Sequence, residues 1–236
     1  MHIAISTRFV LGIIAAATIG VSAVAAEDPD KDPKMVKLLN EARDLIDSQK
    51  AGQAIPKCDE VINAFRAHYG QSTEKVFCAR TSAETLGVLL KAAVDKTNAI
   101  ALSSTWADAH FMKGYALQDL HRLDEAKASV QSALELSPLN SQYRAEMGVI
   151  YALKKDWLKA EQAYKEAEDT APLSPEASKA DDLGRARRGL GYVLVELGKL
   201  DEAEKKYEQC LAANPKDRKA KAELEYVREQ KAKQRK

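Results

Sequence analysis

Histidine and cysteine are the side chains that most often carry metal or redox chemistry, and their spacing in this sequence argues against both. After the first 26 residues the chain has three histidines: His68, His110 and His121. No two histidines form a His-x-x-x-His pair, and no two cysteines form a Cys-x-x-Cys pair. Zinc and dithiol centres ordinarily use such short spacings. We therefore expect no bound metal and no cofactor.

Motifs for phosphate binding and nucleophilic catalysis are also missing. No Gly-rich loop follows a strand-like segment, and no segment is convincing as a strand. A Ser-His-Asp triad depends on spatial adjacency, which a sequence does not display. His110 is expected to pack or to face solvent rather than to bind a ligand. We predict that the protein is not an enzyme.

The composition indicates that helices position the side chains of this protein. Of 236 residues, 45% are hydrophobic but only 6% aromatic, and there are 11 glycines and 7 prolines. Few turn residues and 30% charged residues favour an all-α fold. The formal net charge of +1 leaves no broad basic surface, so we expect no nucleic-acid partner.

The first 26 residues have the order of a secretory signal peptide. Arg8 lies in a short leading stretch, an apolar run follows at residues 9–17, and small residues close the segment. This order directs export and cleavage, here after Ala25 or after Ala26. The alternative is a retained membrane anchor, because residues 9–26 carry no charge over 18 positions, the lower limit for crossing a bilayer. We expect export to the periplasm or beyond, with no membrane span after cleavage.

A spacing of 34 residues governs the chain from residue 107 onward. Four residue pairs recur at this offset: Gly114 and Gly148, Ala126 and Ala160, Ala133 and Ala167, Pro138 and Pro172. A third copy keeps the internal spacings of 12, 7 and 5 with Gly191, Ala203, Cys210 and Pro215. Each copy is typical of two amphipathic helices joined by a short turn, with proline ending the second helix.

These small residues and prolines at a period of 34 resemble the tetratricopeptide repeat. The resemblance covers residues 107–215 in three repeats, at 107–140, 141–174 and 184–217. It implies a right-handed α-solenoid of stacked antiparallel helix pairs that binds a protein or peptide in its concave groove. The sequence departs from the family at its early tryptophan, which is replaced by His110, Arg144 and Arg187.

Residues 27–106 carry a weaker form of the pattern. In the segment 35–66 the spacings are kept by Ala42, Ala54, Cys58 and Val61. In the segment 78–104, Ala92 and Ala99 precede Ala126 and Ala133 by 34 residues. We interpret these segments as two degenerate helical repeats. An unrelated helical cap is the alternative.

Two further segments depart from the repeat. About nine extra residues lie near 173–183, where Ser174-Pro175 allows a helix to begin and run through Gly191; the alternative is a loop as far as Asp182. Residues 216–236 are predicted to form a capping helix over the last repeat. This basic tail has nine basic and four acidic residues.

The resemblance also assigns a concave lining, because in the family it comes from the second, fifth, ninth, twelfth and thirteenth positions of each repeat. The candidate binding residues among these positions are Phe111, Tyr115, Gln118, Asp119, Val149, Arg185, Arg188 and Tyr192. Phe111 and Tyr115 stand where the family's carboxylate clamps have lysine and asparagine. We therefore expect an apolar and aromatic groove with two arginines at one end, rather than a clamp for a peptide C-terminus.

Export would expose the three cysteines to an oxidising compartment. Cys58 is expected on the second helix of the first degenerate repeat and Cys78 on the first helix of the next, so a disulfide between them is one alternative and two free buried thiols the other. Cys210 replaces the alanine of the other copies, which favours a free buried thiol.

Two functions of different classes follow. The first is a protein or peptide interaction module of the bacterial envelope, an adaptor or assembly factor that uses the concave groove. The second is an attachment protein whose basic tail, residues 216–236, binds an anionic polymer. Salt distinguishes them, because binding by the tail should weaken steeply with ionic strength.

We predict that the exported protein begins at Ala26 or Glu27, because the signal order ends there. N-terminal sequencing or the intact mass of protein from its native host tests this. A chain that still starts at Met1 and sediments with membranes would identify an anchor instead.

Overall fold

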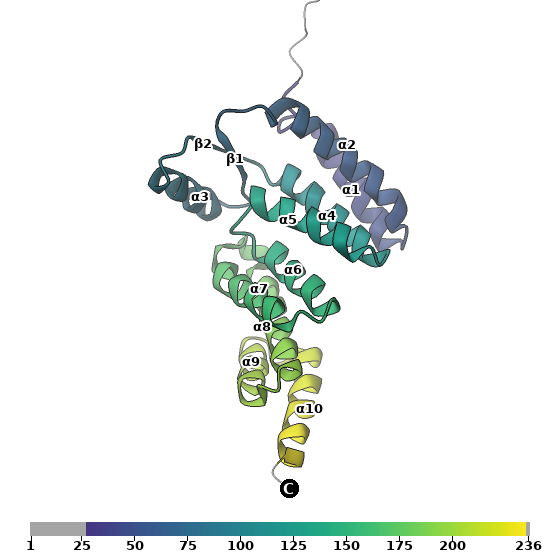
Figure 1. Cartoon of the computed structure of the whole chain (residues 1–236), viewed down its shortest axis with the longest axis vertical. Coiled ribbons are helices and arrows are strands. Elements are labelled where there is room, and N and C mark those ends of the chain that lie inside the picture. Colours follow the sequence, from purple (N-terminus) through teal and green to yellow (C-terminus); the bar gives the residue numbers. More distant parts are fainter. Residues whose placement is uncertain (1–26, 235–236) are drawn as a thin grey trace, which may run out of the picture.

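The computed structural model describes residues 27–234, and the proposed signal segment at 1–26 lies outside these residues (Figure 1). Four antiparallel helix pairs stack along the long axis of the molecule and a final helix covers the end. The pairs are α1 (Pro33–Asp47) with α2 (Ala51–Tyr69), α4 (Thr105–Asp119) with α5 (Leu123–Leu136), α6 (Ser141–Leu153) with α7 (Trp157–Thr170), and α8 (Glu176–Glu196) with α9 (Leu200–Ala213). The predicted solenoid of stacked helix pairs is confirmed.

The same tight turn joins the two helices of every pair. One residue in each turn has a positive φ: 59° at Gln49, 59° at His121, 58° at Lys155 and 73° at Gly198. The next amide donates to a carbonyl five residues earlier, as Lys50 does to Leu45 and Lys199 does to Leu194. Because α1–α2 has this turn, it is a repeat of the same geometry as the three pairs that follow.

Glycine lets the two helices of a pair approach closely. A Cβ atom at Gly114 would lie 2.5 Å from Val130, and one at Gly191 would lie 2.7 Å from the Tyr207 ring. At Gly148 the Tyr164 ring would be 2.8 Å away, and Gly189 of α8 faces the same ring from another side. In each of these three pairs the bulky partner is sixteen residues after the glycine, because all three copies keep the same internal spacings.

The structure corrects the second degenerate repeat. The segment predicted as a helix pair at 78–104 instead contains β1 (Lys75–Cys78), α3 (Ser82–Val94) and β2 (Ala99–Leu102), and the strands pair in parallel with Lys75 opposite Ala99. Cys78 and Ala99 thus lie on strands. Each strand has only four residues, too few to display a period-two pattern in the sequence.

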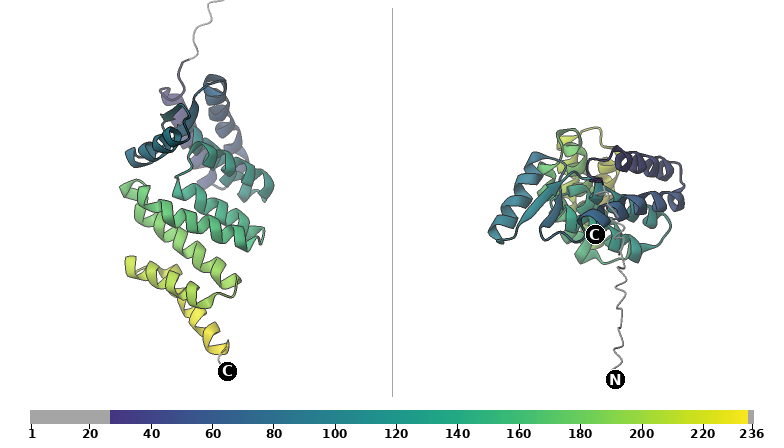
Figure 2. Two further views of the ribbon diagram at one scale, coloured as in Figure 1. Left: turned by 60° about the vertical axis from the view of Figure 1, so that its left-hand side comes forward. Right: turned by 90° about the horizontal axis from the view of Figure 1, so that it is seen from above.

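This βαβ insertion lies between the first two helix pairs without separating them. α4 packs against α2, as α8 packs against α7 in the regular part of the stack. α3 packs on the sheet through Phe77, which contacts Val88 and Ala92, whereas Cys78 joins the core formed with α2 and α4. Leu139, in the turn between α5 and α6, also packs against α3. In both views of Figure 2 the insertion stands to one side of the stack.

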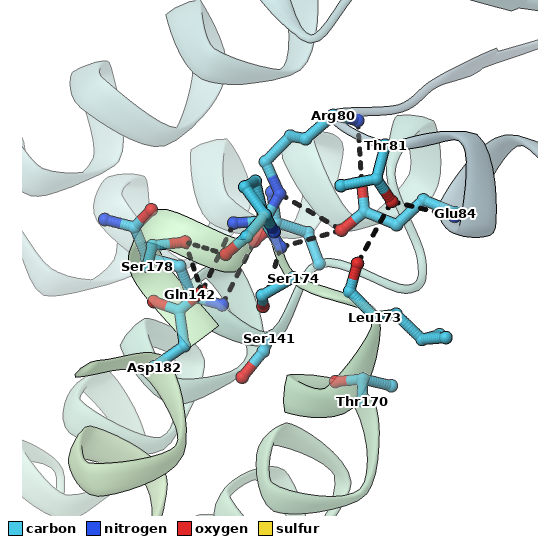
Figure 3. A network of polar contacts seen from close by, with 12 residues as sticks. Arg80, Thr81, Glu84, Ser141, Gln142, Thr170, Leu173, Ser174, Ser178 and Asp182 are labelled. Carbon is cyan, nitrogen blue, oxygen red and sulfur yellow. Dashed lines mark hydrogen bonds and ion pairs between the residues drawn. The ribbon is translucent and has the colours of Figure 1, made fainter. Parts of the chain in front are cut away.

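A buried ionic network fixes the insertion to the third repeat (Figure 3). Arg80 donates to Glu84 at 2.7 Å, and its other guanidinium nitrogen lies 3.5 Å from Asp182 of α8. Glu84 is only 1% exposed and Asp182 6%. The Thr81 hydroxyl also donates to the carbonyl of Leu173 at 3.0 Å. Removing Arg80 would leave two buried carboxylates without their shared cation, which is strongly unfavourable.

The structure also decides between the two alternatives for residues 173–183. A 3-10 turn, η1 (Ala171–Leu173), is followed by Pro175 as the N-cap of α8. The extra residues are therefore helical and lengthen α8 at its beginning. Asp182 lies in this added part, so the two departures from the regular repeat contact each other through Arg80.

The last helix, α10 (Arg218–Gln234), covers the end of the stack (Figure 1). Ala220, Leu224 and Val227 are buried in the same core as α8 and α9. Its other side is polar and exposed. This arrangement agrees with a capping helix, which a solenoid needs to cover its terminal apolar surface.

Replacing Gly148 with alanine tests the close helix contact. The added methyl group would meet the buried Tyr164 ring, which Gly189 confines on another side. We expect the free energy of unfolding to fall by about 1–3 kcal/mol, the usual cost of overpacking. Urea denaturation followed by circular dichroism measures it.

Gly52→Ala is the matched control, because a Cβ atom there has no neighbour within 4 Å. Alanine restricts the unfolded chain and favours helix, so this variant should be as stable as the wild type or more stable by up to about 1 kcal/mol. Equal effects of the two substitutions would contradict the proposed contact.

Candidate binding groove

A hollow of about 420 Å³ lies on the side of the solenoid formed by the first helix of each pair. It is lined from α1, α4, α6 and α8 by Arg43, Ile46, Asp47, Phe111, Met112, Tyr115, Asp119, Gln142 and Arg185. Four predicted binding residues are brought together there: Phe111, Tyr115, Asp119 and Arg185. Hereafter this set of nine residues is called the upper groove.

The two aromatic side chains of the upper groove differ in their exposure and in their contacts with other rings. Phe111 is half-buried and stacks on Tyr143, with ring centroids 4.9 Å apart. Tyr143 is fully buried, and its hydroxyl donates to Asp108. Tyr115 is 36% exposed and makes no ring contact of this kind among the described residues. Tyr115 is therefore the aromatic side chain best placed to contact a ligand.

The charged side chains of the upper groove balance each other. Arg43 and Arg185 are opposed by Asp47 and Asp119, and no ion pair among these four residues is present in the described part of the chain. Arg43 donates one hydrogen bond to Asn40 at 3.3 Å. A charged side chain whose other hydrogen-bonding groups are not used within the protein can use them for a ligand. The groove can thus accept acidic and basic groups of one partner.

A buried carboxyl group lies next to this hollow. Glu146 of α6 is 2% exposed, and one of its oxygens has no hydrogen-bond partner. Burial raises the pKa of Glu146 to about 7, against the opposing effects of Arg185 and a hydrogen bond from Gln118. Gln118, another predicted site residue, is thus partly occupied in supporting Glu146 beside the groove.

Sequence reasoning missed the contribution of α1, although the signal was present. Ala42 precedes Ala54 by 12 residues, as Gly114 precedes Ala126, so Ala42 occupies the glycine position of the first repeat. The ninth, twelfth and thirteenth positions are then Arg43, Ile46 and Asp47, and all three line the upper groove. Glu146, by contrast, is at the sixth position of its repeat, which is not one of the concave positions, so the repeat pattern did not predict it.

Three predicted site residues lie elsewhere. Val149 packs against the core of the third repeat. Arg188 is held by an ion pair with Asp217, just before α10. Tyr192 is 44% exposed and meets the edge of Trp157, with centroids 6.2 Å apart. The structure therefore does not bring these three residues into the upper groove.

The three cysteines are buried and His110 is half-buried. In the structure Cys58, Cys78 and Cys210 are all buried, free thiols. Cys78 lies on β1 rather than on a neighbouring helix. Burial raises the pKa of both Cys58 and Cys78 to about 12, which suppresses the reactive thiolate. Burial also lowers the pKa of His110 to about 4, so it is neutral at pH 7.

Some of the positive charge of the basic tail is already paired. Arg228 lies 2.8 Å from Glu204 and 2.7 Å from Glu208, and Lys231 lies 2.5 Å from Glu204. These acidic partners belong to α9. Over residues 27–234, no helix is both long and apolar enough to cross a membrane, and no cluster of His, Cys, Asp and Glu is suited to a metal ion.

Glu146 makes stability depend on pH. Its pKa is about 7 in the folded protein and about 4.5 ordinarily, so between these values the folded state holds more protons than the unfolded state. Stability contributed by the protonated acid is thus lost as pH rises through this window. We expect Glu146→Gln to be more stable than the wild type by about 1–3 kcal/mol at pH 8 and equal to it at pH 4.5.

Chemical denaturation at the two pH values measures this difference. Glu176→Gln is the control, since Glu176 is highly exposed and its substitution should shift stability little at either pH. A Glu146→Gln effect that is the same at pH 4.5 and pH 8 would show that the carboxyl group is not titrating between folded and unfolded states.

Comparison with known proteins identifies the repeat. Tetratricopeptide repeat family models match residues 111–175 and 184–217. No curated protein matches the sequence. Among solved structures, PilF of Pseudomonas aeruginosa has 14% identity and a TM-score of 0.61, over 86% of this chain and 71% of PilF.

A second solved structure, the MamA RS-1 ArsTM double mutant, has 14% identity and a TM-score of 0.55, over 85% of this chain and 86% of that protein. At such low identity the likeness concerns the fold alone. Together with the repeated turn and the glycine contacts, the matches establish that the chain is an α-solenoid carrying tetratricopeptide repeats at residues 111–175 and 184–217.

Proposed function

We propose that this protein is an interaction module that binds an extended segment of a partner protein in the upper groove. The observation that carries the proposal is the convergence of Tyr115, Asp119 and Arg185 from two different repeats on one hollow, with Arg43 and Asp47 from a third. Tetratricopeptide repeats generally serve as non-catalytic scaffolds, which agrees with this role. The proposal includes no enzymatic step.

The chemistry of the groove favours a peptide with an apolar anchor between charged residues. Tyr115 offers an exposed ring, and Arg43 and Arg185 offer forked donors suited to carboxylates. Asp47 and Asp119 suit a basic residue nearby. Because the hollow is lined by the first helix of all four pairs, an extended segment can contact several repeats at once, as concave solenoid surfaces commonly allow.

We place this function in the bacterial envelope, on the strength of the signal order at residues 1–26. An adaptor or assembly factor there would hold a partner without acting on it chemically. The basic tail, residues 216–236, remains the alternative binding element. The ion pairs of Arg228 and Lys231 with α9 reduce the charge that it presents, so we rank the groove first.

Selection from a displayed library of random twelve-residue peptides tests the groove. We expect enriched peptides with an aromatic or large aliphatic residue flanked by charges. Tyr115→Ala and Arg185→Ala should each weaken the binding of a selected peptide by more than about 1 kcal/mol, since both side chains line the hollow. Isothermal titration calorimetry measures this change. The melting temperatures should stay near that of the wild type.

Matched controls use the same residue types away from the groove. Tyr226 is 46% exposed on α10, and Arg122 forms a surface ion pair with Glu125. Tyr226→Ala and Arg122→Ala should leave peptide affinity unchanged. If the two groove variants bind normally while Lys219→Gln with Lys221→Gln abolishes binding, the tail carries the function instead.

A further inference from the structure

The inserted helix α3 is apolar on two opposite sides. Its inner side, with Val88 and Ala92, is buried against β1 and β2. On its outer side Leu86 is 60% exposed, Leu90 57% and Val94 81%. An ordinary surface helix has a polar outer face, and a helix that is apolar all round is normally covered.

The outer residues form one continuous surface. At 100° per residue, an arc of about 140° holds no charged side chain but contains Ser82 and six apolar residues: Ala83, Leu86, Leu89, Leu90, Ala93 and Val94. All six are exposed. We call this set the α3 stripe. No other part of the described chain covers it, and α3 lies at the outer edge of the molecule in two views (Figure 2).

Four residues along the middle of the α3 stripe have a spacing that reads the same in both directions. Its central line is Ala83, Leu86, Leu90 and Ala93, with steps of three, four and three residues. Steps of three and four keep side chains on the seam between two packed helices. Two antiparallel helices related by a two-fold axis would therefore place each Leu86 against the other Leu90, and each Ala83 against the other Ala93.

We infer that α3 is a self-association surface, where the α3 stripe of one molecule packs antiparallel against that of a second copy. A two-fold contact requires a self-complementary surface, and the symmetrical spacing provides it. The absence of charge in the stripe removes like-charge repulsion between the copies. Small residues at both ends of the line allow the two helices to approach closely.

The charges beside the stripe favour a second copy over a lipid surface. Helices that lie on membranes usually carry a strongly basic polar face. Here Lys91 is the basic residue within α3, and it lies 3.1 Å from Asp95. The neighbouring acid of α3, Glu84, is buried and bound to Arg80. The polar side of α3 thus has no net positive charge for anionic lipid.

The size of α3 sets the expected strength of the contact. A helix of 13 residues is about 20 Å long. A pair of such helices buries less than the roughly 1,200 Å² that stable specific interfaces need. We therefore expect a dimer that forms reversibly at micromolar or higher concentration.

Sedimentation velocity of the natively purified protein over a concentration series tests this contact. Leu86→Lys and Leu90→Glu should each weaken dimerisation at least tenfold, because a charge would then face a leucine of the other copy. Mixing the two variants should restore dimers, since Lys at 86 of one chain meets Glu at 90 of the other while the remaining leucines pair. The double variant L86K/L90E should also self-associate.

Leu158→Lys is the matched control. Leu158 is 70% exposed on α7, away from α3, so this variant should dimerise like the wild type. Circular dichroism and melting curves establish that each variant is folded. Leu86→Ala adds no charge and should also weaken the dimer. This variant tests the contact even if a charged variant does not fold.

Three results would overturn the inference. One is a wild-type protein that stays monomeric up to millimolar concentration. Another is dimerisation that persists in both single variants, or a mixture that fails to restore it. The third is a monomer that floats with vesicles of phosphatidylcholine and phosphatidylglycerol and loses this binding in L86K, which would assign the α3 stripe to a lipid surface.

Discussion

The close contact between the two helices of a pair is the constraint on which the rest of the structure depends. In three of the four pairs a glycine on the first helix faces a bulky side chain sixteen residues later, as Gly148 faces Tyr164 and Gly191 faces Tyr207. In the first pair Ala42 takes the place of the glycine. This contact fixes the distance and angle within each pair. Pairs built in the same way then stack regularly and align their first helices on one side, where the upper groove forms.

The two departures from the regular repeat stabilise each other. The βαβ insertion brings Arg80 and Glu84, and the lengthened start of α8 brings Asp182. Neither carboxylate would be favourable in its buried position without a cation, and one guanidinium serves both. The insertion is therefore held against the third repeat while its outer helix stays exposed.

In the upper groove, the proposed binding site, neighbouring side chains differ in how they contact the rest of the protein. Phe111 supports Tyr143 by stacking, whereas Tyr115, one helical turn later, is free of such a contact among the described residues. Glu146 remains buried beside Arg185 with an oxygen that has no partner, a cost that a well-packed alanine would avoid. Such local losses of stability are common where a binding surface must keep polar groups available.

The sequence by itself determined the repeat, because a 34-residue spacing of glycine, alanine and proline reflects helix contacts that recur along the chain. It also determined Phe111, Tyr115, Asp119 and Arg185 as groove residues, and the same spacing contained Arg43, Ile46 and Asp47. These features depend on local periodicity. Only the tertiary structure decided the βαβ insertion, since four-residue strands have no periodic signal and are stabilised by pairing with each other.

The tertiary structure also decided which predicted residues are available for binding. Arg188 and Arg185 are only three positions apart, yet Arg188 is occupied by Asp217, 29 residues later, and Arg185 faces the hollow. The pairing of Arg80 with Asp182 spans 102 residues in the same way. Contacts between residues so distant in sequence depend on how the whole stack is assembled, and no local pattern of side chains specifies them.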